Sequence, residues 1–273
     1  MSEAASRFGH FHDENGRSTF RVFAPEKHKV VVHLTDTGHA LPLAADPLGY
    51  WHASCIRLAE GSRDLVELDG RRSPDIASRR QPDGVHGASA IATPQRASSP
   101  GWRGVRIEDA IIYELHLGTF TPRGTLAAAC ENLRHLAELG ITVVEPMPIA
   151  AFPGHRNWGY ERTYLFALQA DNGDYSDLKR FIEAAHALGM ALLDVVYNHF
   201  GPEGNYSRVY GPCNPADADG AQFRLSDTQR SAACRATLVL ASGGVSERGE
   251  MHALRGGNLS ACRSEVARGG RIQ

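Results

Sequence analysis

The segment that most constrains the fold is residues 111–196, where short apolar runs alternate with two amphipathic stretches of helical period. The apolar runs that we interpret as strands are residues 111–115, 141–145 and 190–196. The order strand-helix-strand-helix-strand requires parallel pairing and right-handed crossovers. It therefore predicts part of an α/β barrel, a fold whose chemistry lies at the carboxyl ends of its strands.

The two amphipathic stretches carry signals for helix ends. Thr125 and Ser176 can act as N-caps, and Gly140 and Gly189 can end the helices. The side chains predicted to face the sheet are Leu126, Ala129, Leu133, Leu136, Leu178, Phe181, Ile182, Ala185 and Leu188. A long loop, residues 146–175, follows the second strand on the face where barrels bind substrates.

The sequence before this segment alternates in short runs broken by Pro, Gly and Asp, which is typical of a small antiparallel β-sandwich. The runs are residues 19–23, 30–34, 51–56 and 65–68. A stretch rich in Ser and Pro then reads as a linker. We expect a multi-domain chain with a sandwich at 1–92, a linker at 93–108 and a barrel part at 109–206.

Composition excludes several classes of function. A net charge of -2 without any Lys/Arg block argues against partners such as nucleic acid or a membrane surface. The N-terminus has no apolar signal core and no long apolar run occurs, so a cytoplasmic location is expected. The five cysteines have no C-x-x-C spacing, which indicates free thiols. No nucleotide or zinc-protease motif is present, and we expect no cofactor and no metal.

Five residues are predicted to bind a substrate. Asp194, Asn198 and His199 end the third strand, where rigid packing can hold an acid, an amide and an imidazole toward a polar ligand. Trp158 and Tyr160 lie in the long loop, and aromatic rings of this kind stack on the apolar faces of sugars. Structural roles are the alternative. Asp194 could bond to nearby backbone groups, His199 could lie at the edge of the core, and the two aromatic rings could anchor the loop.

Three further polar side chains follow the first two strands. Glu114 and His116 can supply polar contacts, and Glu145 is a candidate general acid. Glycoside hydrolysis needs two carboxylates about 5 to 10 Å apart. No motif pairs Glu145 with Asp194 or Glu203, so we favour a structural role for Glu145.

Several runs within residues 18–206 match a known family. They include Pro74-Asp75, Ser78-Arg79, Gln-Pro-Asp-Gly-Val-His-Gly at 81–87, Tyr-Glu-Leu-His-Leu-Gly-Thr-Phe-Thr-Pro at 113–122, Glu-Pro-Met-Pro at 145–148, Arg-Asn-Trp-Gly-Tyr at 156–160, and Asp-Val-Val-Tyr-Asn-His-Phe-Gly-Pro-Glu-Gly-Asn-Tyr at 194–206. Together they resemble the malto-oligosyltrehalose trehalohydrolases of the alpha-amylase family of glycoside hydrolases. The runs at 81–87 and 201–206 favour this family over the glycogen branching enzymes.

The resemblance implies a carbohydrate-module-like sandwich followed by an eight-stranded barrel. It implies hydrolysis, with retention, of the alpha-1,4-glucosidic bond adjacent to trehalose in malto-oligosyltrehalose, so the expected partner is this alpha-1,4-glucan. In the family, the residues matching His199 and Tyr160 contact the sugar at the cleavage subsite, and the residue matching Asp194 supports the site. Asn198 matches a calcium ligand of amylases, whereas trehalohydrolases are not expected to need the metal.

The chain also departs from the family. The nucleophilic Asp is expected after the fourth strand in a Gly-Phe-Arg-x-Asp-like motif and the acid/base Glu after the fifth, and neither motif is found. Asp64 replaces a strand aromatic, and Asn172 stands where Tyr is usual. Residues 207–273 contain Arg but no Lys and few aromatics, so we expect an irregular tail that arose from a frameshift.

The sequence therefore predicts a sandwich followed by an incomplete (β/α)8 TIM barrel of three strand-helix units, with no catalytic residue of the family in the chain. Catalysis without nucleophile and proton donor is not expected. Three other hypotheses stay open: a non-catalytic glucan-binding fragment, a product without function, and a relative of 1,4-alpha-glucan branching enzyme. Activity on malto-oligosyltrehalose and retention on starch distinguish them.

Overall fold

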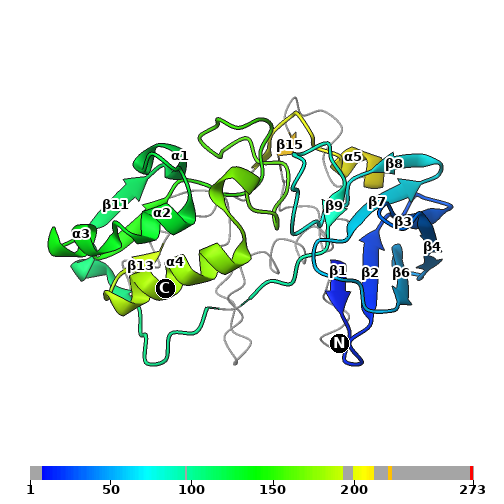
Figure 1. The fold of residues 1–273 in the computed structure, drawn as a ribbon. Coiled ribbons are helices and arrows are strands. Elements are labelled where there is room, and N and C mark those ends of the chain that lie inside the picture. Colours follow the sequence, from blue (N-terminus) through cyan, green and yellow to red (C-terminus); the bar gives the residue numbers. More distant parts are fainter. Residues whose placement is uncertain (1–7, 96, 193–198, 212–220, 223–270, 273) are drawn as a thin grey trace.

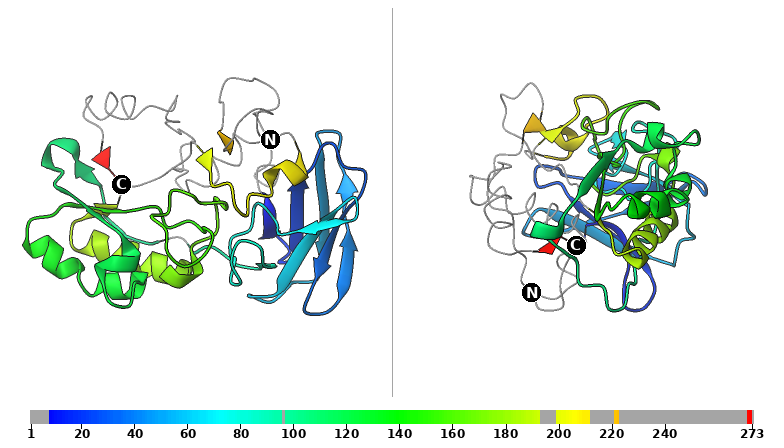
Figure 2. Two further views of the ribbon diagram at one scale, coloured as in Figure 1. Left: turned by 90° about the horizontal axis from the view of Figure 1, so that it is seen from above. Right: turned by 90° about the vertical axis from the view of Figure 1, so that its left-hand side faces the viewer.

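The computed structural model describes residues 8–95, 97–192, 199–211, 221–222 and 271–272. A β-sandwich and an α/β unit lie at opposite ends of the molecule (Figure 1). The helix α5, although it follows the α/β unit in sequence, lies beside the sandwich in both Figure 1 and Figure 2.

The sandwich consists of two antiparallel sheets, as the sequence predicted. Alternate residues of β2 and β7 are buried, because one face of each strand packs on the core. The sheet orders are β1-β2-β6-β5 and β4-β3-β7-β8, with β9 paired to β7. The strands are β1 (Gly9–His12), β2 (Ser18–Phe23), β3 (Val30–Leu34), β4 (His39–Pro42), β5 (Ala44–Ala45), β6 (Tyr50–Cys55), β7 (Arg63–Leu68), β8 (Arg71–Ser73) and β9 (Ser89–Ala90).

Two carboxyl groups are buried at one end of this sandwich. Asp64 on β7 is 2% exposed, and its Oδ2 has no hydrogen-bond partner among the described residues. Asp75 follows β8 and accepts a hydrogen bond from the Ala77 backbone N–H at 2.9 Å. Burial raises the pKa of Asp75 to about 6, and burial together with the charge of Asp75 raises that of Asp64 well above its usual range.

The core of the sandwich includes residues from far along the chain. Tyr210 in α5 (Ser207–Tyr210) is fully buried among Phe20, Val66 and other core residues. Its hydroxyl donates to the carbonyl oxygen of Pro74, 136 positions earlier, at 2.7 Å. The range expected to be an irregular tail thus begins with a helix that packs against the sandwich core.

The α/β unit has the predicted parallel sheet, in the order β11-β12-β13. Its helices cover one face, where Leu115, Val144, Phe181 and Met190 are buried together. The elements are β10 (Val105–Arg106), η2 (Ile107–Asp109), β11 (Ile112–Leu115), α1 (Leu117–Phe120), α2 (Leu126–Cys130), α3 (Leu133–Glu138), β12 (Val143–Pro146), η3 (Ala170–Asn172), α4 (Tyr175–Ala187) and β13 (Ala191–Leu192).

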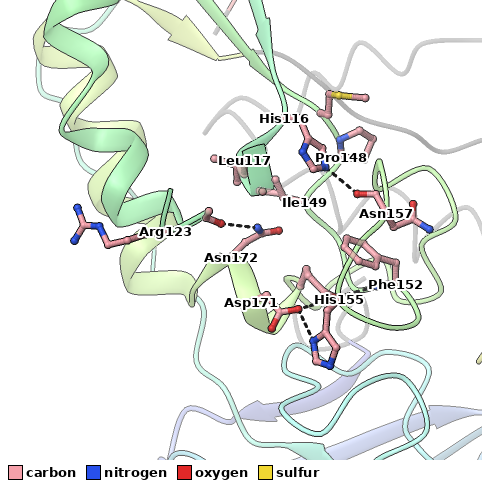
Figure 3. A pocket seen from close by; sticks show the side chains of 14 residues that line it. His116, Leu117, Arg123, Pro148, Ile149, Phe152, His155, Asn157, Asp171 and Asn172 are labelled. Atoms are coloured by element: carbon pink, nitrogen blue, oxygen red, sulfur yellow. Dashed lines mark hydrogen bonds and ion pairs between the residues drawn. The ribbon is translucent and has the colours of Figure 1, made fainter. Parts of the chain in front are cut away.

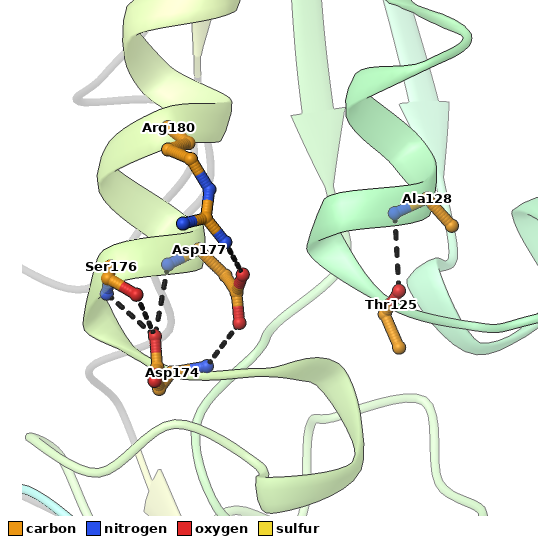
Figure 4. A network of polar contacts seen from close by, with 6 residues as sticks. All are labelled: Thr125, Ala128, Asp174, Ser176, Asp177 and Arg180. Atoms are coloured by element: carbon orange, nitrogen blue, oxygen red, sulfur yellow. Dashed lines mark hydrogen bonds and ion pairs between the residues drawn. The ribbon is translucent and has the colours of Figure 1, made fainter.

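Two helix predictions need correction. Residues 125–139 form two helices, α2 and α3, because the Asn132 side chain donates to the Ala128 carbonyl and interrupts the helical bonding. The N-cap of α4 is Asp174 and not Ser176. The Asp174 carboxylate accepts from the N–H groups of Ser176 and Asp177, and Asp177 accepts from Asp174 N–H in return (Figure 4). The predicted Thr125 cap of α2 is confirmed.

The expected linker is packed against α4. Trp102 stacks on His186 with ring centroids 4.4 Å apart, and His186 Nδ1 lies 2.7 Å from Ser99 Oγ. The backbone N–H of Ser98 donates to Glu183 at 2.7 Å. These contacts attach residues 98–102 to the α/β unit.

Part of the range expected to be an irregular tail forms short strand pairs. The strand β14 (His199–Phe200) pairs with β15 (Ala221–Gln222), and β10 pairs with β16 (Arg271–Ile272). Residues 212–220 and 223–270 lie outside the described residues. Among the described helices none is long and apolar enough to cross a membrane. Cys55 and Cys130, the cysteines within the described ranges, are free thiols.

Candidate functional site

The carboxyl end of β11 holds the loop that follows β12. His116 comes directly after β11, and its Nε2 lies 2.9 Å from the carbonyl oxygen of Asn157. Its Nδ1 lies 3.1 Å from Thr119 Oγ1. Because a carbonyl only accepts, Nε2 carries a proton, while Nδ1 lies within hydrogen-bond distance of the Thr119 hydroxyl. Both ring nitrogens are thus satisfied, which fixes the orientation of the imidazole.

Asn157 organises the turn that carries the two predicted aromatic residues. Its side-chain oxygen accepts from Gly159 N–H at 2.8 Å, and its amide donates to Glu161 at 2.9 Å. Gly159 has a φ of 91°, and a Cβ there would overlap the carbonyl of Pro148. This turn leaves Trp158 72% exposed and Tyr160 36% exposed. The conformation of the Trp158-Gly-Tyr160 turn is therefore fixed by hydrogen bonds and by Gly159, and both rings reach the surface.

A pocket of about 190 Å³ opens between the connection from β11 to α2 and the loop from β12 to α4 (Figure 3). Leu117, Met147, Pro148, Ile149 and Phe152 form its apolar lining. The polar lining residues are His116, Arg123, His155, Asn157, Gln169, Asp171 and Asn172. The pocket lies at the carboxyl ends of two parallel strands, the position at which barrel proteins bind ligands.

The charged groups of this pocket are paired. His155 Nδ1 lies 3.0 Å from Asp171 Oδ2, which also accepts from Gln169 at 2.9 Å. Arg123 donates to Glu131 at 2.5 Å. Within the described residues, no group of three or more His, Cys, Asp or Glu could hold a metal ion. Each charged side chain of the pocket thus already has a partner in the protein, which favours an uncharged ligand.

The segment after the third strand lies beside the aromatic turn. Gly201 N–H donates to the Arg162 carbonyl at 2.8 Å, and the Arg162 guanidinium lies 5.8 Å from the centroid of the Phe200 ring. The structure therefore brings β14, which contains His199, next to the chain that follows Tyr160. Asp194 and Asn198 lie outside the described residues.

The run at 81–87 of the sandwich contacts the run at 201–206. His86 Nδ1 lies 2.8 Å from the Tyr206 hydroxyl, and Tyr164 donates to the Val85 carbonyl at 2.7 Å. A Cβ on Gly204 would overlap the Val85 side chain. Burial raises the pKa of Tyr164, so its hydroxyl stays protonated as the donor. Two runs that the sequence analysis singled out separately thus form one joint between the sandwich and the α/β unit.

Sequence reasoning placed the loop correctly but missed the pocket. Glu114 is exposed on β11 and Glu145 lies opposite it on β12. Arg123, His155 and Asp171 have no motif of their own, and only their position in loops that follow strands could have indicated them.

The parallel strands, their covering helices and a pocket at the carboxyl edge are the arrangement found in α/β-barrel proteins. The sequence profile of the alpha amylase catalytic domain matches residues 74–217, and the chain belongs to this family. A solved Salmonella typhimurium protein described as an alpha amylase has a TM-score of 0.76 at 33% identity, over 91% of this chain and 45% of its own.

Among curated proteins, the chain is similar to malto-oligosyltrehalose trehalohydrolases. The identity to that of Saccharolobus solfataricus is 43% over 208 residues, which are 75% of this chain and 37% of the relative. For Deinococcus radiodurans it is 40% over 196 residues, 71% of this chain and 32% of the relative. A 1,4-alpha-glucan branching enzyme from Shewanella baltica is 28% identical over 211 residues, 66% of this chain and 28% of the relative. The chain spans about a third of the length of the trehalohydrolases it matches.

Proposed function

We propose that the chain binds an alpha-1,4-glucan at the loop face of its α/β unit, as part of a malto-oligosyltrehalose trehalohydrolase. The observation that carries the proposal is the 40–43% identity to trehalohydrolases over about 200 residues, which include the loop face. The substrate would be malto-oligosyltrehalose, cleaved at the alpha-1,4 bond next to trehalose. The cytoplasmic location expected from the N-terminal sequence belongs to the same proposal.

In this proposal the Trp158-Gly-Tyr160 turn is the stacking platform. The two rings are exposed at 72% and 36% on a turn fixed by Asn157, so little conformational entropy is lost when a sugar stacks on them. His199 would contact the sugar and Asp194 would support the site, as the family resemblance implies. Asn198 is the third polar residue predicted to bind the substrate from the end of the same strand.

We further propose that these 273 residues bind without turnover. They contain no Gly-Phe-Arg-x-Asp run, and the nearest sequence, Gln-Phe-Arg-Leu-Ser at 222–226, has Ser226 at the position of the nucleophile. A hydroxyl there cannot act as the carboxylate nucleophile that a retaining glycosidase uses.

The test is a titration of the chain with maltoheptaose, followed by tryptophan fluorescence. Binding is expected at millimolar concentrations, because contacts from further barrel strands are not available. Tyr160→Ala should weaken binding about tenfold, whereas Tyr113→Ala should leave it unchanged. Tyr113 is a matched control because its exposure of 37% is close to the 36% of Tyr160, whereas it lies on β11 and not in the aromatic turn. Equal binding by the two variants would contradict the proposal.

Turnover is tested with malto-oligosyltrehalose as substrate. No trehalose above a buffer blank is expected. Trehalose release that is lost in Asp227→Ala would show that a carboxylate one position beyond the motif serves as the nucleophile.

A second candidate is a chain transferase, since the chain is also 28% identical to a branching enzyme. The two candidates differ in product. Hydrolysis releases trehalose, whereas transfer would produce alpha-1,6 branch points in amylose, detected by debranching and chain-length analysis.

A further inference from the structure

We propose that the pocket bounded by His116, Arg123, Phe152, Asn157, Asp171 and Asn172 is a subsite for one glucose unit of the glucan. It adjoins the Trp158-Gly-Tyr160 turn, and the inference rests on the proposed function. We call it the lateral subsite. It would extend the bound glucan beyond the two aromatic rings.

The size of the pocket sets the size of its ligand. Pockets that hold drug-sized molecules measure about 300 to 1,000 Å³. A volume of about 190 Å³ is smaller and fits a single sugar ring. The pocket is open at the rim, so the rest of an oligosaccharide can continue outward across the loop face.

The lining combines apolar and polar groups, as a ligand with both C–H faces and hydroxyl groups requires. Phe152 and Ile149 provide an apolar surface for the C–H face of a ring, and Asn157, Asn172 and Asp171 provide polar groups around it. Each charged side chain already has a partner in the protein, since His155 Nδ1 lies 3.0 Å from Asp171 Oδ2 and Arg123 donates to Glu131. A phosphate or carboxylate ligand would have to break these pairs, whereas a neutral hydroxylated ligand would not.

The polar groups are already oriented. Asn172 donates to the Gly124 carbonyl at 3.0 Å, and Gln169 donates to both Asp171 and the Gly154 carbonyl. Figure 3 shows the His155 and Asp171 side chains directed toward each other at the rim. Rigid lining groups reduce the entropy lost on binding, which matters for a ligand with few contacts.

Asn157 connects the pocket to the aromatic turn. It lines the pocket, and the next residue is Trp158. The hydrogen bond from His116 Nε2 to the Asn157 carbonyl, 2.9 Å long, fixes this connection to the end of β11 (Figure 3). His116 is therefore a positioning residue, because its hydrogen bond fixes where Asn157 and the aromatic turn lie relative to the pocket.

The experiment is an NMR titration of the full chain with maltoheptaose. The imidazole signals of His155, assigned by their loss in His155→Ala, should shift along with the Trp158 indole signal. His155 is suited to this because its side chain is 86% exposed, and the substitution is not expected to disturb the fold. Shifts of Trp158 without any shift of His155 would overturn the inference and leave the proposed function intact.

Two variants test the pocket by affinity. Asn172→Phe fills it and should weaken maltoheptaose binding roughly tenfold, while His155→Ala should weaken it a few fold. The matched control is His39→Ala, an exposed histidine on β4 of the sandwich. If Asn172→Phe also lowers the urea midpoint of unfolding, its loss of binding is not used as a test. The His155→Ala affinity and the NMR titration then decide whether the pocket binds the glucan.

The outcomes separate the two proposals. Wild-type affinity in both pocket variants, with binding lost in Tyr160→Ala, would overturn the lateral subsite alone. Shifts of His155 produced by sodium phosphate and not by maltoheptaose would also overturn it. Absence of maltoheptaose binding to the unmodified chain would overturn both proposals.

Discussion

The sandwich should depend on a residue that follows the whole α/β unit. Tyr210 is fully buried in the sandwich core, and its hydroxyl donates to Pro74. Replacing a buried aromatic ring by Ala costs about 3 to 5 kcal/mol, and a buried carbonyl left unpaired adds about 1 to 3 kcal/mol. The sum approaches the whole stability of a small domain, about 5 to 15 kcal/mol. Tyr210→Ala should therefore leave the sandwich largely unfolded or barely stable.

Fluorescence of Trp51 can report on the sandwich alone. Its indole N–H donates to the Ala24 carbonyl at 3.0 Å, and the ring packs on the sandwich core. The chain has three tryptophans, so replacing Trp102 and Trp158 by Phe leaves Trp51 as the single reporter in a urea titration. The free energy of unfolding from this signal should fall by about 4 kcal/mol or more in Tyr210→Ala.

Two companion variants separate ring packing from the hydrogen bond. Tyr210→Phe keeps the ring and should lose about 1 to 3 kcal/mol. Leu48→Ala is the control, since Leu48 is 73% exposed and should change the free energy by less than about 0.5 kcal/mol. An unchanged Trp51 transition in Tyr210→Ala would refute the reasoning and show that the sandwich is stable without α5.

Three further variants have defined expectations. Asp174→Ala removes the N-cap of α4 and should lower the free energy of unfolding by about 1 kcal/mol, whereas Ser176→Ala should change it little. A larger loss of stability in Ser176→Ala than in Asp174→Ala, measured by urea titration, would show that Ser176 is the cap. For Asp75, the folded-state pKa of about 6 exceeds the unfolded value of about 3.9, so its contribution to stability is full below pH 4 and falls as the pH rises toward 6. Asp75→Asn should remove this loss of stability, which is worth about 3 kcal/mol. The free energy of unfolding is measured against pH for both proteins, and the same pH dependence in the two would contradict the prediction. Gly159→Ala should displace the aromatic turn from Pro148 and weaken maltoheptaose binding without changing the Trp51 transition; wild-type affinity would count against the rigid turn.

The sequence by itself determined the elements whose burial has a regular period. Strands β2, β3, β6, β7, β11 and β12 were predicted within a few residues, because alternation or an apolar run records which side of the strand is buried. The Thr125 cap and the Gly140 stop are local, since each depends on bonds within one turn of the helix. The loop face was likewise predictable from strand order alone.

Only the tertiary structure decided which distant residues meet. Short strands such as β8 and β9 exist through pairing with β7, and their own residues carry no period long enough to read. The burial of Tyr210 in the sandwich and the pocket between His116 and Asn172 both arise from contacts between segments far apart in the chain. Periodicity reports that a side chain is covered, but what covers it depends on the packing of the whole chain, which no local pattern records.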